Sequence, residues 1–141
     1  MFGEFALVVA ALFTGAAIYI NWAEQPARLG LEDSPMLEEW KPSYARGFQM
    51  QASLAVIGFI LGTLEWMVTG RSIWFLGALA LVANWPFTIF VIMPVNKELE
   101  ATPIERADER TRALIEKWGA LHGVRSALGL LSVGLFLWAS I

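Results

Sequence analysis

Four long stretches without a charged residue dominate this sequence. They hold 19 residues after Glu4, 18 after Arg46, 25 after Arg71 and 16 after Arg125. A helix needs about 20 mostly apolar residues to cross a bilayer, so the pattern predicts four transmembrane helices. The last stretch is short, because 16 residues of helix reach only about 24 Å. The fourth helix must therefore begin earlier, which places Arg125 near the membrane boundary.

The expected fold is all-α, an integral membrane four-helix bundle that forms a single domain over residues 1–141. The predicted helices are Phe5–Trp22, Phe48–Val68, Ile73–Val95 and Trp118–Ile141. A tight link at Gly70 makes the second and third helices antiparallel, and the longer links 23–47 and 96–117 lie together at the other end. Within the second link, Thr102-Pro103-Ile104-Glu105 resembles a helix start, with proline at the first helical position.

Composition excludes several classes of protein. The chain has no cysteine and one histidine, which excludes thiol catalysis, disulfides, iron–sulfur ligation and a multi-histidine metal site within one chain. Only 16% of residues are charged and the net charge is −3, so the sequence lacks the basic surface of a nucleic-acid partner. The expected surroundings are the lipid bilayer.

Polar residues gather at the long-link ends of the predicted helices. On the fourth helix, Trp118, His122, Arg125 and Gly129 share one face. One interpretation makes His122 a proton acceptor or metal ligand, Arg125 an anion-binding group and Trp118 a platform for a planar ligand. The alternative is an interfacial belt, in which Trp118 lies at headgroup depth, Arg125 extends to the surface and His122 packs.

The third helix carries a second polar face, formed by Asn84, Thr88 and Asn96 around Ile92. Pro86 removes one backbone donor and predicts a kink. Asn84 and Thr88 either satisfy the backbone there or bind a ligand, and structural bonding is favoured for Asn84. A role for Asn96 requires that it meets His122.

The end of the first helix holds Asn21 and Glu24, with Arg28 beyond Pro26. Glu24 either forms a salt-bridged helix end with Arg28 or serves as a carboxylate partner to the polar groups of the fourth helix. Asn21 is a second candidate ligand contact on this helix. Gly58 and Gly62 form a GxxxG sequence, a weak signal for close helix packing.

These segments together resemble a known family. The resemblance rests on residues 17–28, 40–44, 46–48, 84–88, 91–96 and 118–127, including Met93-Pro94-Val95-Asn96 and the spacing of Trp118, His122 and Arg125. They are similar to the anthrone-oxygenase-like family of small four-helix membrane proteins, most bacterial members of which are classed as a domain of unknown function.

The resemblance implies an oxygenase that uses O₂, with neither metal nor flavin, on a small aromatic or quinone-like molecule. Characterised relatives of this kind oxidise polyketide anthrones to anthraquinones. Carried over, His122 takes a proton from the substrate, Arg125 and Asn96 stabilise the enolate oxygen and then superoxide, and Trp118 stacks on the rings. The full set of candidate residues is catalytic His122, Arg125 and Asn96, with substrate contacts from Trp118, Glu24, Asn21, Asn84 and Thr88.

Two other functions stay open at this point. The first is a non-enzymatic membrane subunit or ligand-binding protein. The second, less favoured, is a haem or metal protein in which His122 is the sole side-chain ligand from each chain. Four spans also fall below most transporter architectures unless the chain forms a homo-oligomer.

Cationic residues predict the orientation of the bundle. Nine of the ten Lys and Arg residues lie at the long-link end, and only Arg71 lies at the other. The positive-inside rule therefore places the long links in the cytoplasm and both termini outside it.

A reporter fused after Ile141 tests this orientation. We expect it to be active only on the extracytoplasmic side, because that end of the bundle carries one cation against nine. The same reporter inserted in the link 96–117 serves as the control and is expected to be active only in the cytoplasm. The opposite pattern would reverse the orientation without affecting the four helices.

Overall fold

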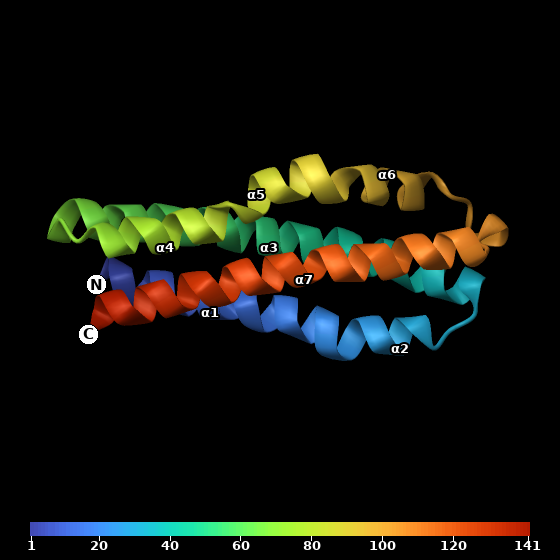
Figure 1. Cartoon of the computed structure of the whole chain (residues 1–141), viewed down its shortest axis with the longest axis horizontal. Helices are drawn as coiled ribbons and strands as arrows, with labels where there is room; N and C mark the ends of the chain where they lie inside the picture. The colour runs from blue at the N-terminus through green and yellow to red at the C-terminus, as the bar shows by residue number, and fades with distance from the viewer.

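The computed structural model describes residues 1–141 as four long antiparallel helical units without a strand (Figure 1). The units in chain order are α1 (Phe2–Tyr19) with η1 (Ile20–Glu24) and α2 (Gln25–Leu29); α3 (Asp33–Thr69); α4 (Ser72–Val82) with α5 (Asn84–Phe87), η2 (Thr88–Ile92) and α6 (Met93–Ala101); and, after the short η3 (Ile104–Arg106), α7 (Glu109–Ser140). All four are long and apolar enough to cross a membrane. The predicted all-α membrane bundle is confirmed.

Both predicted long links are wrong in extent, because the helices continue far beyond their apolar parts. The first unit runs through Pro26 to Leu29, and α3 begins at Asp33 rather than at Phe48. Pro26 is tolerated because the helix widens into the π turn Ile20–Glu24 directly before it, which accommodates the missing N–H and the proline ring. Hydropathy detects the part of a helix that faces lipid, and these polar extensions carry no such signal.

The third unit also ends later than predicted, and the predicted start of the last one is wrong. α6 continues past Pro94 to Ala101, and Thr102 ends that helix instead of opening the next. α7 begins after Asp108, whose side chain accepts a hydrogen bond from the Thr111 amide at 3.0 Å. Thr111 Oγ1 in turn accepts from the Asp108 amide at 3.3 Å, which completes a capping box. The Thr111 amide and the Thr111 hydroxyl both donate to the Asp108 carboxylate, and these two bonds lower the pKa of that carboxyl.

Two π-helical turns interrupt the first and third units. They cover Ile20–Glu24 and Thr88–Ile92, and each is followed by a proline at the second position of the next helix, Pro26 or Pro94. Proline lacks an N–H and its ring crowds the carbonyl one turn earlier, so the preceding turn widens by one residue. Each π turn rotates the helix beyond it relative to the helix before it.

The predicted kink at Pro86 is confirmed by a break between α4 and α5 at Ala83, where the ribbon in Figure 1 shifts sideways. Asn84 Nδ2 donates a hydrogen bond to the Leu81 carbonyl at 2.9 Å. The structural bonding favoured for Asn84 therefore occurs at the break.

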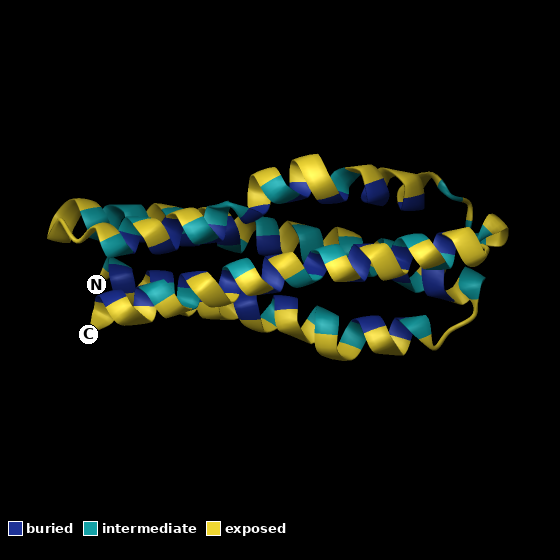
Figure 2. Ribbon diagram, in the orientation of Figure 1, coloured by how far each residue is buried: buried dark blue, intermediate teal, exposed yellow.

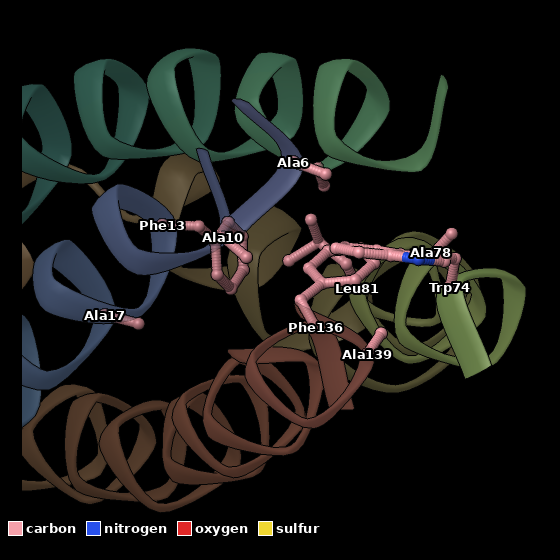
Figure 3. Close-up of a cluster of buried hydrophobic side chains, with 10 residues drawn as sticks. Ala6, Ala10, Phe13, Ala17, Trp74, Ala78, Leu81, Phe136 and Ala139 are labelled. Atoms are coloured by element: carbon pink, nitrogen blue, oxygen red, sulfur yellow. The ribbon is translucent and has the colours of Figure 1, made fainter. Parts of the chain in front are cut away.

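Large and small side chains alternate in the core near the Gly70 end (Figure 3). Phe13, Leu81 and Phe136 are fully buried, and alanines of α1 and α4 lie against them. Gly58 and Gly62 of α3 lie against Leu81 and Phe136, which confirms the close packing indicated by the GxxxG sequence. Exposed residues lie on the outer helix faces (Figure 2), as expected of a bundle surrounded by lipid.

Gly77 of α4 tests this packing. A Cβ added there would lie 2.6 Å from two ring carbons of buried Phe136. We expect Gly77→Ala to destabilise the bundle by about 1–3 kcal/mol, seen as a lower thermal unfolding temperature in detergent. Gly134→Ala is the control, because no atom lies within 4 Å of its added Cβ. Equal unfolding temperatures for the two variants would contradict close packing at Gly77.

Candidate functional site

A hollow lies between the helices at the level of both π turns. It encloses about 320 Å³ including its mouth, and we call it the first hollow. Its lining residues are Ile20, Tyr44, Gly47, Phe48, Gln51, Ile92, Asn96, Trp118, His122 and Arg125. The structure therefore brings His122, Arg125, Asn96 and Trp118 together around one space. That space is narrow and takes about one or two waters without side-chain movement.

Arg125 is a buried cation with neutral partners only. Its Nη1 donates to Thr88 Oγ1 at 3.0 Å, and its Nη2 donates to Gln51 Oε1 at 2.8 Å. The guanidinium lies over the Phe13 ring, 5.7 Å from the centroid, and the residue is only 7% exposed. No carboxylate forms an ion pair with it. A buried charge of this kind is costly unless an anion joins it.

Four polar atoms on the residues of the first hollow are buried without a hydrogen-bond partner. They are Gln51 Nε2, Asn96 Oδ1, His122 Nε2 and Arg125 Nε. Buried polar atoms are nearly always paired, so a concentration of unpaired ones in one space indicates a ligand-binding site. The amide nitrogen and the guanidinium are donors, and the Asn96 oxygen is an acceptor.

His122 is held between α7 and the first helical unit. Its ring stacks on Trp118 with centroids 5.1 Å apart and planes 23° apart. The imidazole faces the backbone carbonyl of Ala17, and its Nε2 remains free. The Arg28 guanidinium also lies over Trp118, 5.6 Å from the ring centroid. These contacts fix the direction in which the free nitrogen points.

One face of α3 supplies residues that received no specific role in the sequence analysis. Asn96 Nδ2 donates to the Tyr44 hydroxyl at 3.1 Å, and Gln51 holds Arg125. Tyr44 stacks in parallel on Trp40, with centroids 4.8 Å apart, and Trp40 meets Trp118 edge-on. Trp40, Tyr44 and Gln51 recur at i, i+4 and i+11, a helical spacing that could have identified this face.

Glu24 and Asn21 lie outside the first hollow. Glu24 pairs with Arg28, which also pairs with Glu39, so the geometry is that of a salt-bridged helix end. A regular α-helix would point Glu24 in nearly the same direction as buried Ala17, seven residues earlier. The π turn instead turns Gln25 and Arg28 inward.

Asn21 connects the first helical unit to α7. Its Nδ2 donates to the Gly119 carbonyl at 2.9 Å, and its Oδ1 accepts from Ser126 Oγ at 2.8 Å. These bonds fix α7 on both sides of His122. Asn21 therefore lies where it can position the histidine, without lining the space beside it.

Asn84 and Thr88 line a second hollow on another side of Arg125. This second hollow encloses about 270 Å³, and its lining residues are Phe48, Gln51, Ala52, Ala55, Asn84, Trp85, Thr88, Ile89 and Arg125. Thr88 holds the guanidinium, and Asn84 Oδ1 is buried without a partner. Arg125 and Gln51 thus border both hollows.

The comparisons with known proteins add one finding about the family. A family model described as anthrone oxygenase matches residues 40–135, more than half of the chain. No curated protein and no solved structure matches.

The structure has no group of three or more His, Cys, Asp or Glu side chains that could hold a metal ion.

The two buried arginines should respond oppositely to removal of their charge. Arg125→Met removes a buried cation that has no counter-ion, so we expect an unfolding temperature equal to or above that of the unaltered protein. Arg28→Met leaves two carboxylates without their cation and should cost about 1–3 kcal/mol, a moderate figure because both carboxylates are partly exposed. Thermal unfolding in detergent measures both variants. A larger loss for Arg125→Met would contradict this description of its surroundings.

Proposed function

Because the chain belongs to the anthrone oxygenase family, we propose that it is a membrane oxygenase that oxidises a small planar aromatic with O₂ and without a cofactor. The observation that carries this proposal is the buried, carboxylate-free Arg125 beside the free Nε2 of His122 in one hollow. Together they offer a proton acceptor and a stabiliser for the anion that remains.

His122 is the base in this proposal. An anthrone carries a methylene between two aromatic rings that are conjugated with a carbonyl across the central ring, so its deprotonation gives an enolate. The free Nε2 has no competing protein partner, and Trp118 and Ala17 fix the ring on its other sides. A positioned base of this kind typically contributes about 10²–10⁴-fold to the rate.

Arg125 and Gln51 stabilise the enolate oxygen. Their unpartnered atoms, Nε of Arg125 and Nε2 of Gln51, are both donors on residues of the first hollow. Fixed donors in a water-poor site favour a developing oxyanion strongly. Asn96 has its amide nitrogen committed to Tyr44, so its free Oδ1 suits a substrate hydroxyl. This differs from the enolate-stabilising role that the family resemblance implied for Asn96.

The reaction balances with O₂ as the only oxidant. The enolate gives one electron to O₂, which leaves a carbon radical and superoxide, and these combine into a peroxide that the protonated histidine neutralises. Loss of the remaining C–H proton then breaks the O–O bond and releases water. In sum, R₂CH₂ and O₂ give R₂C=O and H₂O.

The depth of the first hollow suits a substrate that dissolves in the membrane but carries polar oxygens. The 19 residue steps from Gln51 to Gly70 span about 28 Å of helix, close to the thickness of a hydrocarbon core. With Gly70 at one boundary, Gln51 lies at the other. By the cation count, this is the cytoplasmic boundary.

Substitution of His122 and Arg125 tests the mechanism. We expect His122→Ala to lower kcat for an anthrone or hydroquinone under O₂ by about 10²-fold or more, because the proton acceptor is lost. Arg125→Lys should also lower turnover, since an ammonium cannot replace the planar fork of donors. The assay is oxygen uptake by purified protein with chelator present.

Tyr19→Ala is the control, because it removes an aromatic ring that is 61% exposed and lies outside both hollows. Near-normal turnover of His122→Ala would remove the histidine from the mechanism. Activity lost to the chelator would indicate a metal, and a Soret band in the purified protein would indicate haem. Failure on every such substrate would favour a ligand-binding role.

A further inference from the structure

The second hollow differs in character from the first, although Arg125, Gln51 and Phe48 border both. Only the first hollow is lined by Trp118, His122 and Asn96, so it adds an aromatic platform and two unpartnered polar atoms to those of Arg125 and Gln51. The second adds Asn84, whose Oδ1 is also unpartnered, and small or apolar side chains, among them Ala52, Ala55 and Ile89. The Arg125 guanidinium is therefore accessible from two spaces with different chemistry.

The second hollow also lies deeper in the bundle. Ala55 is 15 residue steps from Gly70, which corresponds to about 22 Å of helix, inside a hydrocarbon core of about 30 Å. The first hollow extends the other way along α3, to Gly47 and Tyr44. One space thus faces the acyl chains, and the other faces the boundary.

An open groove on the outer surface leads to the second hollow. It runs over Val56 and Ile57 of α3 and shares Phe48, Ala52 and Trp85 with the hollow. Trp85 Nε1 donates to the Ala52 carbonyl at 3.2 Å, which holds α5 against α3 at this point. Ala52 therefore borders both the groove and the hollow with a small side chain.

We propose that the second hollow delivers O₂ from the membrane interior to Arg125 while the aromatic substrate occupies the first hollow. This inference rests on the proposed function. O₂ is small, uncharged and more soluble in hydrocarbon than in water, so it suits a narrow, partly apolar space that opens towards acyl chains. Both hollows are narrow, so a planar multi-ring substrate needs side-chain movement to enter either one, whereas O₂ needs little.

The Arg125 guanidinium, which borders both hollows, can stabilise the anion on either side of it. One electron passes from the enolate in the first hollow to O₂ in the second, so the substrate becomes a radical and O₂ becomes superoxide. Negative charge thereby moves from one side of Arg125 to the other, and the same cation stabilises both anions. Superoxide then passes Arg125 into the first hollow, where its oxygen bonds to the substrate radical and gives the peroxide described above.

Ala52→Leu tests the route by narrowing the passage. We expect the KM for O₂ to rise about tenfold, with the KM for the aromatic substrate and kcat at saturating O₂ changed by less than about twofold. Ala45→Leu is the matched control, because it makes the same change at an exposed position of α3 that lines neither hollow. If Ala52→Leu does not fold, Ala52→Val should give a smaller shift in the same direction.

Xenon binding gives a readout that does not depend on turnover. Small apolar cavities bind xenon, so purified protein should show a saturable xenon NMR signal that Ala45→Leu keeps and Ala52→Leu loses. An unaltered protein that binds xenon in this way but oxidises no substrate would count against the oxygenase proposal and leave the gas site supported. A xenon signal that Ala52→Leu leaves unchanged would overturn the gas site.

The kinetic result also separates two uses of the groove. If Ala52→Leu raises the KM for the aromatic substrate and leaves that for O₂ unchanged, the groove admits the substrate and the proposal is wrong. If neither KM changes, O₂ reaches Arg125 by another way and the proposal is equally wrong.

Discussion

Burying the Arg125 guanidinium away from water costs free energy, and this cost determines which groups face it in the middle of the bundle. A cation inside an apolar bundle needs several hydrogen-bond acceptors, and here an amide oxygen from α3 and a hydroxyl from η2 supply them. Phe13 adds the face of its ring. Three helical units other than its own thus turn a polar or aromatic group towards one side chain, and none of those groups is an anion.

Arg28 shows how a buried arginine is surrounded where its charge stabilises the fold. Arg28 is equally buried but binds Glu24 and Glu39, and its third partner is the Gln25 side chain. Its hydrogen bonds fix a helix end and support Trp118 from one side. Two arginines in one small bundle therefore meet opposite surroundings, and only one of them is left able to attract a further anion.

Sequence patterns predict the number of helices and the polar end of the bundle well, because both depend on where charge is absent. Helix ends are less accessible, since α3 continues for about four turns before its apolar part. The face of α3 that carries Tyr44 and Gln51 can be predicted only from its helical spacing, because its polar residues alternate with aromatic ones that resemble ordinary membrane packing. The position of Glu24 outside the first hollow is hard to predict for a different reason. Its direction depends on the extra residue in the π turn, which residue types alone do not reveal.

The two π turns have a consequence for how such chains can change over time. Deleting one residue within Ile20–Glu24 or Thr88–Ile92 would restore an unbroken α-helix, a form that membranes accept readily. Such a deletion would leave the residues on either side in nearly the same directions, because a π turn holds one residue more than an α-helical turn. Gln25 would then follow Ala17 by seven residues and stay on the same face of the helix. A relative of unchanged length that lost the π turn would instead be rotated by about 100° beyond it, and Glu24 would point inward in place of Gln25. A shortened chain can therefore keep the arrangement that a chain of full length with a regular helix would lose.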